Sequence, residues 1–165
     1  KELNLKVVAI IHTHAHLDHI LAAGEIKNAT GAPIYLHKGD QFLWDMVEEQ
    51  CAMFGVPTVS LPEPDHYIAD DQAFDCCGAV AIHTPGHTPG SVSFWFDEYK
   101  TLIAGDTLFQ GSIGRTDLPG GNFDEIKQSI SQRLYTLNDD AVVITGHGAS
   151  TTIGREKQSN SFVRA

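Results

Sequence analysis

Residues 13–19 read Thr13-His14-Ala15-His16-Leu17-Asp18-His19, which places four metal-ligand residue types within six positions. An apolar, β-branched run at residues 6–11 precedes them and predicts a strand, and the apolar spacing of residues 17–29 predicts a helix. In a turn that leaves a strand, His14 and His16 can point to one side, while Asp18 and His19 enter the helix and can reach a second position. Imidazole and carboxylate groups suit zinc, manganese or non-haem iron. One loop could therefore serve two ions.

Further ligand types stand in glycine-bearing turns at predicted strand ends, at His87, Asp106 and His147. A lone histidine is usually a surface residue or a hydrogen-bonded core residue. Packing several imidazoles together without a metal would be costly, because each polar ring needs a partner when it leaves water. The sequence therefore predicts one metal centre assembled from distant segments. The histidines outside these motifs are predicted to be structural: His12, His37, His66 and His83.

Strands alternate with helices along the rest of the chain. We predict strands at residues 33–36, 79–83, 92–96, 101–104 and 141–145, and helices at residues 41–54 and 123–137. Residues 56–65 contain three prolines and are predicted to be a loop. Short connections between the elements imply sheets covered by helices. At 165 residues, the chain is predicted to be a single domain, residues 1–165.

Composition and charge argue against several classes of protein. The formal net charge is −10 and no basic run is present, so no nucleic-acid partner is predicted. The three cysteines form no Cys-x-x-Cys pair, which favours neither a disulfide framework nor a thiolate zinc site and predicts a reducing, cytoplasmic location. The longest apolar runs fall far short of the ~20 residues of a membrane span, so no membrane role is predicted.

The order of the ligand residues resembles that of the metallo-β-lactamase superfamily. All seven ligand positions of that family hold the expected residue type: His14, His16, Asp18, His19, His87, Asp106 and His147. The resemblance implies an α/β (α+β) fold, the αββα four-layer sandwich. It also implies one ion on His14, His16 and His87, a second ion on Asp18, His19 and His147, and Asp106 as the bridge. The implied cofactors are two divalent metal ions, Zn²⁺ foremost, with iron or manganese suited to the same ligands.

Within the superfamily, residues 111–121 and 151–156 resemble the single-domain relatives of glyoxalase II, the hydroxyacylglutathione hydrolases. Asp106 argues against a true β-lactamase with a three-histidine site, because those typically carry Cys there. The resemblance implies a small-molecule thioester substrate, glutathione-derived, that is cleaved by hydroxide generated at the two metals. Asp18 would orient this hydroxide as well as bind metal. Arg115 occupies a position where these relatives use a cation, so we predict that it anchors a substrate carboxylate; a surface ion pair with Asp117 is the alternative.

Two other functions stay open. A persulfide dioxygenase resembles glyoxalase II, shares a Gly-Arg-Thr-Asp stretch like residues 114–117, and holds a single iron on two histidines and an aspartate. The other possibility is that the chain is a non-catalytic, oligomerising piece. It is motivated by the strands that members of the superfamily carry before the His-x-His motif, which have no counterpart here. We expect either a longer natural gene or a homo-oligomer that covers the amino-terminal edge, where residues 7–11 look like an interior strand.

Overall fold

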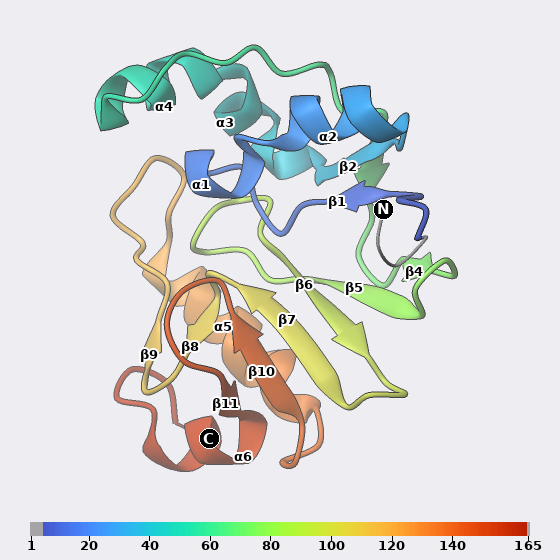
Figure 1. Ribbon diagram of the computed structural model, residues 1–165. Coiled ribbons are helices and arrows are strands. Elements are labelled where there is room, and N and C mark those ends of the chain that lie inside the picture. The colour runs from blue at the N-terminus through green and yellow to red at the C-terminus, as the bar shows by residue number, and fades with distance from the viewer. Residues whose placement is uncertain (1–4, 165) are drawn as a thin grey trace.

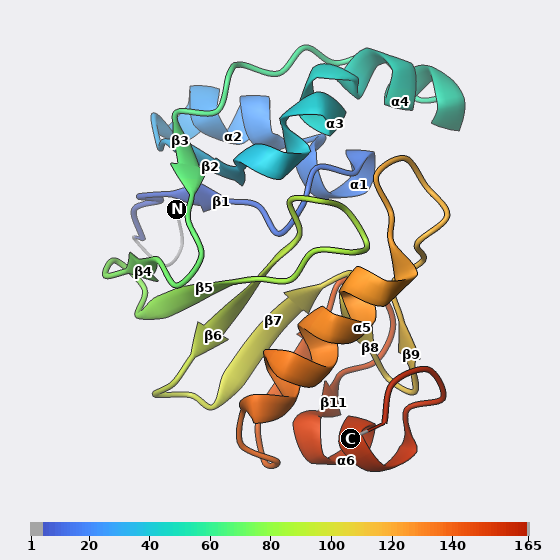
Figure 2. The ribbon, with the colours of Figure 1, turned by 180° about the vertical axis from the view of Figure 1, so that it is seen from behind.

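The computed structural model describes residues 5–164, and their elements stack as helices, sheet, sheet and helices (Figures 1 and 2). The smaller sheet is parallel, in the order β1-β2-β3, with β1 at Ile10–Ile11, β2 at Ile34–His37 and β3 at His66–Ile68. Its outer face is covered by α1 (Leu17–Ile20), α2 (Ala23–Thr30), α3 (Gln41–Asp45) and α4 (Val47–Phe54). A short 3-10 turn, Lys38–Asp40, joins β2 to α3.

The larger sheet has six strands in the order β11-β10-β7-β6-β5-β4. These are β4 (Ala73–Phe74), β5 (Ala79–His83), β6 (Val92–Phe96), β7 (Thr101–Gly105), β10 (Val142–Thr145) and β11 (Thr151–Thr152). The β7 and β10 strands run parallel, whereas the other neighbours are antiparallel. The helices α5 (Phe123–Gln132) and α6 (Ile153–Ser159) lie on its far side, and a 3-10 turn at Leu134–Thr136 follows α5 (Figure 2). A two-stranded hairpin, β8 (Leu108–Phe109) and β9 (Ser112–Ile113), stands beside the sheet.

Three apolar clusters hold these layers together. One joins the small sheet to α1–α4 and includes Ile34, Leu36 and Trp44. Another lies between the two sheets, where Phe74 and Phe94 are buried. The remaining cluster packs the larger sheet against α5 and α6. Burial of each apolar face against a neighbouring layer is the main force that holds the sheets in register, and it leaves the strand ends free to carry polar side chains.

The predicted strands at residues 79–83 and 92–96 are confirmed to the residue, as β5 and β6. The three predicted helices are each interrupted. The first divides into α1 and α2, and the second divides into α3 and α4 at Met46. The third ends at Gln132 and continues as the 3-10 turn. At Met46 the break has a packing reason, because it allows both Trp44 before it and Cys51 after it to reach the buried cluster under the sheet.

The predicted strand at residues 6–11 is shorter in the structure, where β1 covers only Ile10–Ile11. Val7 and Val8 are 41% and 49% exposed, so these residues do not form the interior strand that their sequence suggested. The β1 strand is paired with β2 at one edge of the described part of the sheet. Across residues 5–164, no helix combines the length and apolar character that crossing a membrane requires.

Candidate metal centre

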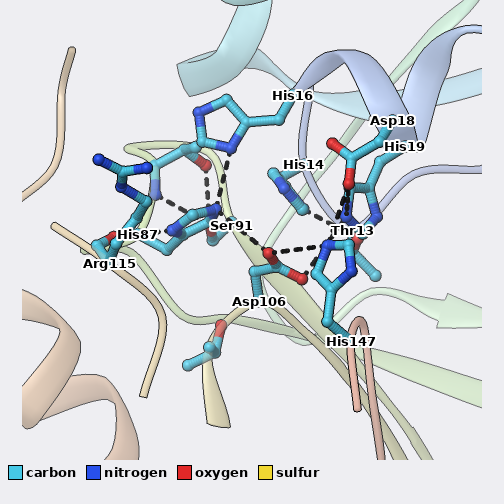
Figure 3. Close-up of polar contacts among 12 residues, drawn as sticks. Thr13, His14, His16, Asp18, His19, His87, Ser91, Asp106, Arg115 and His147 are labelled. Carbon is cyan, nitrogen blue, oxygen red and sulfur yellow. Dashed lines mark hydrogen bonds and ion pairs between the residues drawn. The ribbon is translucent and has the colours of Figure 1, made fainter. Parts of the chain in front are cut away.

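The structure brings all seven predicted ligands together at one end of the two sheets (Figure 3). His14 and His16 lie in the loop after β1, and Asp18 and His19 begin α1. The other three follow strands or lie between them: His87 in the β5–β6 connection, Asp106 directly after β7 and His147 after β10. The β5, β7 and β10 strands run in the same direction, so their carboxyl ends lie at one edge of the larger sheet, and residues far apart in the sequence meet there.

His14, His16 and His87 form the first set, in which the ligand atoms lie within 4.8 Å of one another. His16 Nδ1 is 2.9 Å from His87 Nε2. The other ring nitrogen of His87, Nδ1, lies 2.8 Å from the carbonyl oxygen of Arg115. A carbonyl only accepts, so His87 Nδ1 carries the proton and the lone pair of Nε2 faces the centre. His14 and His87 are only 1% and 2% exposed, so two of the three side chains in this set are shielded from solvent.

Asp18, His19 and His147 form the second set, again with ligand atoms within 4.8 Å of one another. Asp18 Oδ2 lies 3.0 Å from His147 Nε2 and 3.4 Å from His19 Nε2. The side chains of Asp18 and His147 are 57% and 59% exposed. This set therefore opens to solvent, in contrast to the first.

Asp106 lies between the two sets (Figure 3). Its Oδ2 is 3.7 Å from His87 Nε2 and 3.5 Å from His147 Nε2, and its Oδ1 is 3.5 Å from His19 Nε2. Its approach to His147 depends on Gly146, because a Cβ at that position would collide with Asp106 Oδ1. The glycine beside His147 is therefore part of the site, since it gives the carboxylate its space.

Burial lowers the pKa of three histidines of the centre, His14, His16 and His19. It lowers the pKa of His14 well below its ordinary value, and neighbouring imidazoles lower it further. Burial, followed by the charge of His87, lowers the pKa of His16 to about 4. The pKa of His19 is also lowered, mainly by burial, although Asp106 opposes the shift. Neutral imidazoles are the form that binds metal, so these ligands need lose no proton near neutral pH.

Unpaired polar atoms test whether a metal fits this site. Within residues 5–164, the buried side-chain atoms without a hydrogen-bond partner include His14 Nε2, His19 Nε2 and Asp106 Oδ1. These three residues themselves form a group of close ligand atoms. A buried polar atom without a partner costs about 1–3 kcal/mol, so several in one place call for a common partner. A divalent cation meets that need, and the residues present fit one.

Asp40 is a functional residue that the sequence did not reveal. It is fully buried, and its carboxylate accepts hydrogen bonds from Ala15 N at 2.9 Å, Thr88 Oγ1 at 2.8 Å and Gly90 N at 2.6 Å. Ala15 separates His14 from His16, and the other two donors, Thr88 and Gly90, directly follow His87 in the chain. Asp40 therefore ties the two ligand loops to each other. Gln50 supports the first loop in a similar way, through a hydrogen bond of 3.1 Å from its Nε2 to Ala15 O.

A cavity of roughly 510 Å³ adjoins the centre and is lined by ligands of both sets, including Asp18 and His87. Arg115 also lines it. The Arg115 guanidinium donates two hydrogen bonds of 2.7 Å to the Asp117 carboxylate, and the two side chains are 61% and 68% exposed. The surface ion pair between Arg115 and Asp117, considered above as the alternative, is thus present. The role of Arg115 as a substrate anchor stays a prediction.

A sequence model of the family described as the metallo-beta-lactamase superfamily matches residues 1–147. The chain belongs to the metallo-β-lactamase superfamily. A similar relative is the hydroxyacylglutathione hydrolase GloC of Haemophilus influenzae, which is 40% identical over 169 residues that cover 100% of this chain and 80% of that protein. Membership in the superfamily supports a metal-dependent hydrolase. It also confirms the resemblance seen in the order of the ligand residues.

Solved structures of the superfamily confirm the predicted four-layer fold. The di-iron-bound form of TTHA1623 superposes with a TM-score of 0.91 at 35% identity, covering 98% of this chain and 80% of that one. ETHE1 from Myxococcus xanthus gives a TM-score of 0.77 at 26% identity and covers 97% of this chain and 64% of that one. The metal-dependent nature of the superfamily agrees with the ligand groups found here.

Proposed function

We propose that this chain hydrolyses thioesters of the hydroxyacylglutathione type at a binuclear metal centre. The observation that carries the proposal is the pair of three-residue ligand sets with Asp106 between them. GloC, a relative at 40% identity, is named as a hydroxyacylglutathione hydrolase, which supports the choice of bond. Two divalent ions held by these residues would supply Lewis-acid activation of a water molecule and of the carbonyl oxygen.

The side chains around the centre then have separate tasks. His14, His16 and His87 would hold the first ion, and Asp18, His19 and His147 the second. Asp18 lines the cavity and is exposed, so its carboxylate can also accept a hydrogen bond from the attacking water and set its direction. The His87–Arg115 backbone hydrogen bond would keep one ligand ring in position throughout turnover.

The ligand types of the centre limit which metals it can bind. Histidine and carboxylate ligands suit zinc, iron and manganese alike. We propose zinc, with iron as the alternative that the di-iron form of TTHA1623 supports.

A mononuclear iron dioxygenase is the second candidate, supported by the likeness to ETHE1. His14, His19 and Asp106 form a group of two histidines and a carboxylate, as such an iron site requires. A single ion on that group would leave Asp18 and His147 unused, although they form a ligand group of their own with His19. The second ligand set thus favours the binuclear hydrolase.

Elemental analysis of protein purified without added metal tests the proposal, together with hydrolysis of S-lactoylglutathione and oxygen uptake with a persulfide. We expect two ions per chain, thioester hydrolysis and no oxygen uptake. One iron per chain with persulfide-dependent oxygen uptake would overturn the hydrolase in favour of the dioxygenase. Failure to hydrolyse any thioester with two ions bound would remove the proposed bond specificity.

A further inference from the structure

One wall of the cavity beside the metal centre is apolar. The residues that line it include Leu21, directly after α1, and Met46, Met53 and Phe54, the last two in α4. Their exposed fractions are 38%, 39%, 74% and 65%, so they leave large apolar surfaces in water. Apolar surface gathered at one place on a protein marks a binding site for an apolar group. Here that place is a single cavity.

The apolar wall and the ligand residues belong to the same cavity, which His87 and Asp106 also line. A group that rests on Met53 and Phe54 can therefore be attached to the carbonyl that reacts at the centre. The volume of roughly 510 Å³ lies in the range of pockets for small organic ligands. The cavity thus has room for more than a short acyl group.

The cavity has few positively charged side chains in its lining. Among the described residues that line it, Arg115 is the only Lys or Arg, and its guanidinium already binds Asp117. A thiol such as glutathione carries carboxylates that need cationic partners, so its place is at the Arg115 edge. The other arm of the thioester, the acyl group, is then left to face α1 and α4.

We infer that the acyl group of the substrate is an extended hydrocarbon chain, much longer than lactoyl, that lies against Leu21, Met53 and Phe54. This inference rests on the proposed thioester hydrolysis and names its substrate class. Each methylene that leaves water for this wall stabilises the bound state, which corresponds to about fourfold in kcat/KM per buried methylene. The three side chains are specificity-determining residues, because they contact the chain and not the reacting bond.

A series of acyl thioesters on one small thiol, N-acetylcysteamine, tests the inference: acetyl, butyryl, hexanoyl and octanoyl. We expect kcat/KM to rise by about fourfold per methylene until the cavity is filled. A flat or falling series, with S-lactoylglutathione still hydrolysed, would overturn the long acyl chain and leave the proposed function intact. If no thioester is hydrolysed, the proposed function fails as well. A second series keeps the acetyl group and lengthens the alkanethiol of the thioester. A rise of kcat/KM with the length of the thiol, and not of the acyl chain, would overturn the acyl assignment.

Variants of Met53 and Phe54 test whether the apolar wall causes the preference for long acyl chains. Met53→Gln keeps the length of the side chain but makes it polar, and Phe54→Ser removes the ring. We expect both to lower the octanoyl-to-acetyl ratio of kcat/KM at least fivefold. Phe162→Ser is the matched control, because Phe162 is 50% exposed and does not line the cavity, and it should leave the ratio unchanged. If all three variants keep the octanoyl-to-acetyl ratio of the unmodified protein, with metal content and circular dichroism unaltered, the inference is overturned.

Discussion

The two ligand sets of the centre differ in burial although they share Asp106. In the first set, His14 and His87 are 1% and 2% exposed, and His87 is fixed by a hydrogen bond to a backbone carbonyl. In the second set, the Asp18 and His147 side chains are more than half exposed. Fixed, desolvated ligands hold a cation more tightly than mobile, solvated ones. If the centre binds two ions as proposed, we expect the buried set to hold its ion more tightly and the exposed set to exchange its ion more readily.

Asp106→Ala should have the largest effect, because it removes the carboxylate that contacts both sets. We expect loss of dinuclear binding and a fall in kcat of about 10³-fold or more, measured by elemental analysis and thioester hydrolysis. Asp140→Ala is the control, since Asp140 pairs with Lys100 at the surface and should change neither. Two tightly bound ions and full turnover in Asp106→Ala would show that Asp106 is not the bridge.

Removing one histidine from each set separates the two sites directly. We expect His147→Ala to retain one tightly bound ion and to lose about 10²-fold in kcat, because only the exposed set is damaged. His87→Ala should lose the tight ion itself. The check is metal stoichiometry during a chelator titration, where the unmodified protein should release its ions in two phases. Simultaneous release of both ions would contradict the contrast between a buried and an exposed site.

Asp40→Asn tests what holds the buried set in place. The substitution keeps the size of the side chain but replaces one acceptor oxygen by an amide donor, which must face one of the three donors that Asp40 now binds. We expect a loss of about 2–3 kcal/mol in the free energy of unfolding of the metal-free protein, measured by urea denaturation. Asp45→Asn, on the exposed side of α3, is the matched control. Equal stability of the two variants would show that Asp40 does not support the ligand loops.

Asp40 also shows where sequence reasoning ends. The seven candidate ligands could be predicted to lie together because their residue types and local motifs carry the chemistry within a few positions, as at residues 14–19. The partners of Asp40 lie 25, 48 and 50 residues away along the chain, and its own neighbours Lys38 and Gly39 give no sign of them. A hydrogen bond between distant segments exists only once the fold has brought them together.

The fold was predictable to a similar degree. Strands β5 and β6 stand out because each is a compact apolar run between turn residues. The break at Met46 does not, because the apolar spacing continues through it and only packing against the small sheet divides α3 from α4. Strands of two residues, such as β4 and β11, depend wholly on the partner strand and have too few residues for a pattern.

Arg115 connects the buried set to the open cavity, because its backbone and its side chain serve different parts of the site. Its carbonyl accepts the hydrogen bond from His87, whereas its guanidinium lies at the cavity and binds Asp117. Arg115→Ala keeps the carbonyl, so the metal content should not change. If the guanidinium also binds a substrate carboxylate, KM for a glutathione thioester should rise about tenfold, and KM for a small thioester without a carboxylate should change little.

Asp117→Asn probes the same contact from the other side. The guanidinium donates both of its hydrogen bonds to Asp117, so weakening the Asp117 pair should free it for an incoming substrate carboxylate. We therefore expect KM for the glutathione thioester to fall in Asp117→Asn and to rise in Arg115→Ala, with steady-state kinetics as the measurement. Equal effects of each variant on both substrates would leave Arg115 only its surface ion pair. In that case the backbone of this residue, and not its side chain, would be what serves the metal centre.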